Sequence, residues 1–131
     1  MSKKPKHNPR PWGFLDEFRG EGKYFNAEWP TLNEQFDITT ARFPNNKVFE
    51  AFSPKHEVFT YKEAQAIMKG VANKLYEMGV RHGDKVGLTG KNSPEWAIAY
   101  LAISYAGATI VPVDYSLSDD VIAHLLTFAE A

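Results

Sequence analysis

The stretch GVRHGDKVGLTGKNSPEWAIAYLAISYAGATIVPVD, residues 79–114, decides the fold of this chain. Within it, two short apolar runs at residues 85–89 and 108–114 lie on either side of a helical segment. That helix has a clear start, because Ser93 is a good N-cap and Pro94 suits the first helical position. Strand, helix and strand in this order predict a right-handed βαβ unit whose two parallel strands are buried.

A further helix follows in LSDDVIAHLLTFAEA, residues 117–131. Ser118 is its expected cap, and Asp119 and Asp120 in the first turn suit the positive end of the helix dipole. Gly87 in the first strand leaves room for a neighbouring element to approach closely. The residues of this helix expected to face the core are Val121, Ile122, Leu125, Leu126 and Ala129.

A helix and a hairpin are predicted before this unit. Thr31 and Glu34 form a capping-box pattern at the start of a helix expected from Leu32 to about Arg42. After it, the β-prone runs KVFEAF and EVFTY are separated by SPKH, which predicts an antiparallel hairpin. The fold class is therefore α/β: a partial parallel sheet with covering helices, preceded by a helix and a β-hairpin.

The pattern TYKE begins another helix, expected from Tyr61 to Met78 and ended by Gly79. Thr60 and Glu63 repeat the capping-box spacing at its start. Helical periodicity predicts one apolar stripe along it, made of Ala64, Ile67, Met68, Val71, Leu75 and Met78.

The helix at 94–107 is unusually apolar, because no charged side chain occurs between Glu95 and Asp114. Such a helix should be buried on most of its faces. A chain of 131 residues offers too few other elements to cover it, so a partner is expected. That partner is either another copy of the chain or the remainder of a larger protein.

Composition excludes several classes of function. Fifteen basic against 16 acidic residues give a net charge of −1, so no nucleic-acid partner is expected. The absence of cysteine excludes a disulfide framework and a thiolate nucleophile, and favours a cytoplasmic setting. Residues 1–18 are predicted to form a mobile basic arm with an aromatic anchor, followed by one domain at 19–131. A peripheral contact of this arm with anionic lipid is an alternative to a role in solubility.

The segment GLTGK at 87–91 suggests a phosphate-binding loop at first sight. Such a loop needs a glycine five residues before the final glycine, and a Ser or Thr after the lysine. Those positions hold Lys85 and Asn92. The segment is therefore interpreted as a connection from strand to helix.

Other polar residues have structural interpretations. Asp119 and Asp120 are dipole partners rather than metal ligands, and His124 lacks an acid at a useful spacing. His56 and His82 are expected in turns. Lys62, Lys69 and Lys74 are expected on a solvated helix face.

The motifs FTYKEA, GDKV, NSPEW and AGATIVPV, in this order and spacing, resemble the start of the adenylate-forming acyl-CoA synthetase family. The resemblance covers residues 58–131, and NSPEW is most similar to long-chain fatty acid-CoA ligases. It implies the N-terminal subdomain of a ligase that uses Mg²⁺, ATP, a fatty acid and coenzyme A. It also implies that the family's catalytic motifs lie outside these residues, so no catalytic, cofactor-binding or metal-binding residue is assigned.

Three hypotheses follow. The chain is the N-terminal fragment of a fatty acid-CoA ligase, itself inactive; or a stand-alone α/β binding or oligomerisation module; or part of an adenylating relative with another acceptor. The acyl chain length, the acceptor and the oligomeric state are left open by the sequence.

Overall fold

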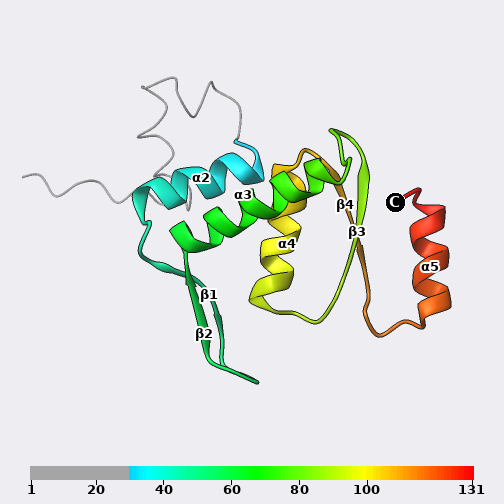
Figure 1. Cartoon of the computed structure of the whole chain (residues 1–131). Helices are drawn as coiled ribbons and strands as arrows, with labels where there is room; N and C mark the ends of the chain where they lie inside the picture. Colours follow the sequence, from blue (N-terminus) through cyan, green and yellow to red (C-terminus); the bar gives the residue numbers. More distant parts are fainter. Residues whose placement is uncertain (1–29) are drawn as a thin grey trace, which may run out of the picture.

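The computed structural model describes residues 30–131, and Figure 1 shows how their elements are arranged. The helices are α2 at Leu32–Arg42, α3 at Tyr61–Glu77, α4 at Pro94–Tyr105 and α5 at Asp119–Phe128. The strands are β1 at Lys47–Ala51, β2 at Glu57–Thr60, β3 at Lys85–Thr89 and β4 at Thr109–Val113. This order confirms the predicted fold class. The predicted basic arm at 1–18 and its boundary with 19–131 lie outside the described residues.

Capping boxes fix the starts of α2 and α3. The Thr31 hydroxyl accepts a hydrogen bond from the Glu34 N–H at 3.3 Å, and the Glu34 carboxylate accepts one from the Thr31 N–H at 2.7 Å. Thr60 and Glu63 repeat both bonds at α3. Donors that a helix start would leave unsatisfied are thus paired locally.

The strands form two separate sheets. β1 and β2 are antiparallel, with Lys47 opposite Thr60 and Ala51 opposite Glu57. β3 and β4 are parallel, and Figure 1 shows α4 and α5 on opposite sides of them. The predicted hairpin and the predicted βαβα order are both confirmed.

The core lies between α3 and α4. Ala64 and Met68 of α3 pack with Ile98 and Ala102 of α4, and all four are buried. Half-buried apolar side chains surround this cluster: Phe36, Val48, Phe49, Phe59, Leu101 and Tyr105.

α4 is largely covered, as its sequence predicts, but by elements of the same chain rather than by the partner that was expected against residues 94–107. It contacts α2, α3, β1 and both parallel strands, and it buries Pro94, Ile98, Ala102 and Ile103. None of the large apolar side chains that are exposed among residues 30–131 belongs to α4. The uncovered apolar surface of this part of the chain therefore lies on other elements.

The predicted apolar stripe of α3 is only partly buried. Ala64 and Met68 are fully buried, but Ile67 is 42% exposed, Val71 is exposed, and Met78 is 72% exposed. Ala72, outside the predicted stripe, is buried instead. The reason is that α4 covers a narrow strip of α3, and no described element covers the adjacent strip. The helix also ends at Glu77, so Met78 is its C-cap.

The predicted burial of the parallel strands and of α5 is wrong for this part of the chain. Val86 and Leu88 of β3 are half-buried, while Lys85, Gly87 and Thr89 are exposed. On α5, Ile122, Leu126 and Ala129 are half-buried, and Val121 and Leu125 are exposed. The cause is that two strands with one helix on each side leave both sheet edges open.

Two smaller findings concern the helices. Ser118 occupies the N-cap of α5 as predicted, but its side chain makes no capping hydrogen bond. In the described range 30–131, no helix combines the length and the apolar content needed to cross a membrane.

Candidate functional site

A crevice of about 530 Å³ lies where the two parallel strands end. β3 ends at Thr89 and β4 at Val113, and parallel strands place their carboxyl ends at the same edge of a sheet. Its lining residues are Gly90, Lys91, Asn92, Trp96, Pro112, Val113, Asp114 and Tyr115. Ligands of open α/β sheets bind outside this edge, so the crevice is the candidate site of this chain.

Aromatic and cationic groups dominate the crevice. The Lys91 Nζ lies 5.8 Å from the centre of the Tyr115 ring, and the Trp96 ring lies 5.4 Å from that of Tyr100. Asp114 is already engaged, because its carboxylate accepts the Ser116 N–H at 2.8 Å. Hydrogen bonds from the Ser116 backbone and hydroxyl hold the pKa of Asp114 below its ordinary value. The crevice therefore presents a lysine cation, the Asn92 amide and aromatic faces.

The N-terminus of α4 opens beside this crevice. The Ser93 hydroxyl accepts the Trp96 N–H at 3.1 Å. The Glu95 backbone N–H and the Ser93 hydroxyl hold the pKa of the Glu95 carboxyl below its ordinary value. A carboxylate thus occupies the place where a helix N-terminus would otherwise receive a phosphate.

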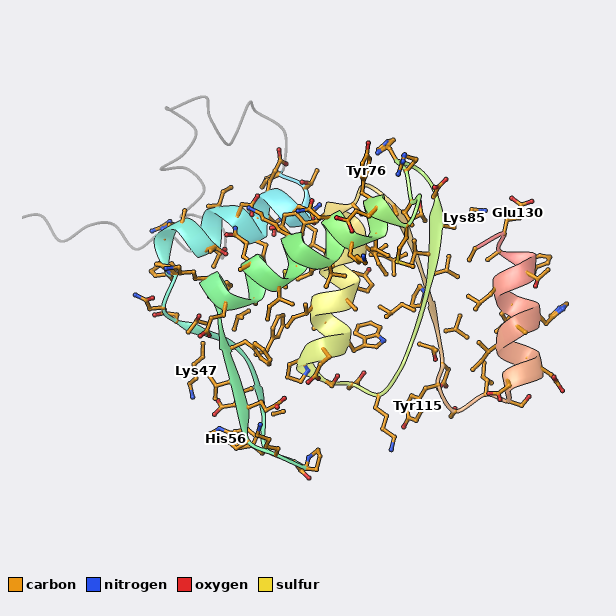
Figure 2. All side chains as sticks on the ribbon, in the orientation of Figure 1. Lys47, His56, Tyr76, Lys85, Tyr115 and Glu130 are labelled. Carbon is orange, nitrogen blue, oxygen red and sulfur yellow. The ribbon has the colours of Figure 1, made fainter. Side chains whose placement is uncertain are left out.

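A second cavity, of about 760 Å³, lies between the hairpin and the start of α4. Its acids are Glu50, Glu57 and Glu95. The Glu50 carboxylate is 2.8 Å from the Lys47 Nζ and 3.0 Å from the His56 Nε2, and Figure 2 shows both on the hairpin. Hydrogen bonds from Lys47 and His56 hold the pKa of Glu50 below its ordinary value. Glu57 has its own ion pair with Lys55 at 3.5 Å, so Glu50 and Glu57 form local surface pairs.

The residues that the sequence singled out stay apart in space. Asp119 and Asp120 are exposed in the first turn of α5, and His124 is exposed on the same helix. His56 lies in the hairpin connection, and His82 lies in the turn before β3. Within the part of the chain that the structure describes, no three His, Cys, Asp or Glu side chains could together hold a metal ion.

One polar cluster was not predicted. The Tyr105 hydroxyl donates to Asp37 Oδ1 at 2.6 Å, and the Gln65 amide donates to the same oxygen at 2.6 Å. Lys69 lies 3.6 Å from that oxygen, and it is exposed as expected, as are Lys62 and Lys74. These partners join α2, α3 and α4. They were missed because they are 28 to 68 residues apart in the chain, where periodicity carries no signal.

Replacing Tyr105 by phenylalanine should lower the free energy of unfolding by about 1–3 kcal/mol at neutral pH, because Asp37 loses a donor. Burial and the Asp37 carboxylate raise the pKa of Tyr105 above its ordinary value of 10.0. Because this pKa is raised in the folded state, the contribution of Tyr105 to the stability of the fold is fully present below pH 10.0. It is lost as the pH rises above that value, where the phenol of the unfolded chain ionises. The difference in free energy of unfolding between Tyr105→Phe and the unaltered chain should therefore be smaller at about pH 11 than at neutral pH.

Urea unfolding at neutral pH and at about pH 11 measures both effects. Tyr76→Phe is the matched control, because Tyr76 is 61% exposed and its loss should change stability by less than about 0.5 kcal/mol. If Tyr105→Phe lowers the free energy of unfolding equally at both pH values, the pKa of the Tyr105 hydroxyl is not raised by folding.

Comparison with known proteins identifies the family. The family model of the AMP-binding enzymes matches residues 36–131. The chain belongs to the AMP-binding enzyme family. This confirms the resemblance to adenylate-forming enzymes that its motifs predict.

Several relatives in the AMP-binding family are similar over most of this chain. Long chain acyl-CoA synthetase 3 of Arabidopsis thaliana is 31% identical over 101 residues, which are 72% of this chain and 15% of that protein. The mitochondrial medium-chain acyl-CoA ligase ACSF2 of Rattus norvegicus is 34% identical over 109 residues, covering 82% and 17%. The chain thus spans less than a fifth of the length of these two relatives.

A solved member of similar fold is the N-terminal subdomain of Klebsiella oxytoca NpsA, in complex with 3-hydroxyanthranilyl-AMSN. Its TM-score is 0.69 at 28% identity, and the match covers 76% of this chain and 25% of that one. The described residues therefore have the fold of part of an N-terminal subdomain.

The loop at residues 90–93 does not fit the triphosphate of Mg-ATP. The position that needs a hydroxyl is Asn92, the Ser93 hydroxyl is used by the helix, and the Glu95 carboxylate repels a phosphate there. Lys85 has its side chain on α5, with the Nζ 2.7 Å from the Ala129 carbonyl oxygen.

Proposed function

We propose that this chain is the N-terminal portion of an AMP-forming fatty acyl-CoA synthetase. The complete enzyme would convert ATP, a fatty acid and coenzyme A into acyl-CoA, AMP and pyrophosphate through an acyl-adenylate. The observation that carries the proposal is the family match over residues 36–131, which includes all of the βαβα unit. The two relatives named above act on long-chain and medium-chain acids, and this supports fatty acids as the substrate class.

In this proposal the chain acts as a scaffold. α3 and α4 supply a core that holds β3 and β4, and these strands direct residues 90–92 and 114–115 to one edge. The phosphate-binding and acid–base groups of the reaction would come from the remainder of the enzyme. Mg²⁺, ATP and coenzyme A would likewise bind there, so the assignment of no catalytic or cofactor-binding residue to this chain stays a prediction.

The test is acid-dependent exchange of pyrophosphate into ATP, which requires an acyl-adenylate. The 131-residue chain should show no exchange above a protein-free blank. The protein expressed from the gene as it continues past the codon for Ala131 should show exchange with palmitate, with less from octanoate and none from 4-coumarate. Exchange with 4-coumarate alone would sink the fatty acid proposal, and exchange by the 131-residue chain would sink its role as an inactive scaffold.

A further inference from the structure

His56 links the connection of the β1–β2 hairpin to strand β1. Its Nε2 lies 3.0 Å from the Glu50 Oε1. Its ring is stacked on the Phe52 ring, with the centroids 5.5 Å apart and the planes at 7° to each other. Figure 1 shows this end of the hairpin projecting away from α2 and α3, and Phe52 is 77% exposed. The imidazole thus holds a strand residue and a residue of the connection together at an exposed place.

The Glu50 carboxylate is shared between two basic side chains. The Lys47 Nζ lies 2.8 Å from the Glu50 Oε2, which leaves Oε1 to His56. The other charges around this end of the hairpin are Lys55 of the connection, Glu57 of β2 and, across the cavity beside it, Glu95 of α4. With Lys47 and Glu50 these make three acids and two lysines. The group therefore carries one negative charge, which a proton on His56 balances.

Protonation strengthens both contacts of the His56 ring. A neutral imidazole carries its single N–H on either of the two ring nitrogens, whereas both nitrogens of the charged form donate. The charged form therefore always presents an N–H to Glu50, and it adds a charge to that hydrogen bond. A cation within about 6 Å of an aromatic ring is also attracted to the face of that ring. Both effects hold the connection more firmly when His56 is charged.

The pH range of this effect depends on Glu50 and His56 together. Hydrogen bonds from Lys47 and His56 hold the pKa of Glu50 below its ordinary value of 4.5. The contribution of the Glu50 charge is therefore present above that pH and is lost as the pH falls below it. Histidine side chains ordinarily lose their proton near about pH 6.5. Both charges are thus present together between about pH 4.5 and about pH 6.5.

We propose that residues 52–56 form a pH-sensitive latch, which is closed onto β1 when His56 is protonated and loosened when His56 is neutral. Residues 52–55 line the cavity of about 760 Å³ beside α4, so the latch sets how well one wall of that cavity is ordered. The His56 side chain is 61% exposed, and pairs at such places are weak. The equilibrium between the closed and loosened forms should therefore shift by about two- to fivefold. The proposal is independent of the proposed function.

Solution NMR of the 131-residue chain from about pH 4 to about pH 8 tests the latch. Nuclear Overhauser contacts between the rings of His56 and Phe52 measure the closed form, and the Cε1–H shift of His56 measures its protonation in the same samples. The ring contacts should weaken by about two- to fivefold from acid to alkaline pH, with the midpoint of the His56 titration. Ring contacts that are independent of pH, or that follow the titration of His82 instead, would overturn the proposal.

Glu50→Gln removes the charge that faces His56 and keeps the shape of the side chain. Glu57→Gln is the matched control, because Glu57 is a carboxylate of the same hairpin that pairs with Lys55 instead. Glu50→Gln should remove the pH dependence of the ring contacts, and Glu57→Gln should leave it unchanged. The amide signals of α3 and α4 verify that each variant stays folded. Equal effects of the two replacements would mean that the overall charge of the hairpin acts in place of the latch, and this result too would contradict the proposal.

Discussion

Replacing Met68 by alanine should lower the free energy of unfolding of the 131-residue chain by about 2–5 kcal/mol. Met68 is fully buried, at 0% exposure, in the cluster that joins α3 to α4. The variant loses the transfer free energy of its side chain and leaves a cavity between two helices that have little freedom to collapse. Urea unfolding followed by far-ultraviolet circular dichroism gives the difference.

Ile67→Ala is the control for this prediction. Ile67 is the preceding residue of the same helix, and it is 42% exposed. Its replacement should cost less than that of Met68, about 1–2 kcal/mol, because 42% of the residue's surface is already in contact with water. Equal costs at the two positions would contradict the packing of α3 against α4.

This pair of positions shows what the sequence could and could not predict. Periodicity placed Ile67 and Met68 in one apolar stripe of α3. The stripe identifies the apolar side of a helix, but which part is buried depends on the neighbour that packs there. Residues 78–93 separate α3 from α4, and the position of α4 on α3 cannot be predicted from the local pattern.

Local signals were sufficient for the elements themselves. The Thr–Glu capping boxes of α2 and α3 fixed both starts, and Gly79 and Gly107 mark where α3 and α4 end. The end of α5 could not be predicted from a glycine in the same way. The left-handed position after this helix is held by Glu130, with φ of 59°, where glycine is usual.

The candidate site was not predicted as a site, although the loop that forms part of it was predicted. The motif around NSPEW correctly indicated a strand-to-helix connection beside Lys91, but the approach of Tyr115 depends on the parallel pairing of β3 with β4. The Asp37–Tyr105 hydrogen bond joins residues 68 positions apart. Contacts of this kind follow from the packing of three helices, which no short window of sequence contains.

Replacing Gly107 by alanine should lower the free energy of unfolding by about 1–3 kcal/mol. Gly107 has φ of +74°, and its N–H donates to the Ser104 carbonyl while the Ala108 N–H donates to that of Ile103. This is the Schellman pattern that ends a helix with a left-handed residue. A Cβ atom there would also lie 2.9 Å from the His82 Nδ1, closer than such atoms normally approach.

Gly79→Ala separates the cost of the left-handed backbone conformation from the cost of the close contact with His82. Gly79 ends α3 in the same pattern, with φ of +105°, but no atom lies within 4 Å of its Cβ position. Its replacement should therefore cost only the conformational part, about 1 kcal/mol.

Gly70→Ala, in the exposed interior of α3, should stabilise the chain by about 0.5–1 kcal/mol.

Adding His82→Ala to Gly107→Ala should restore the part of the loss that comes from the close contact, and bring the cost near that of Gly79→Ala. The comparison is made between the double variant and His82→Ala alone, by urea unfolding. If the loss at Gly107 stays the same without the imidazole, the contact with His82 contributes nothing. The backbone conformation alone would then account for the glycine that joins the end of α4 to the turn before β3.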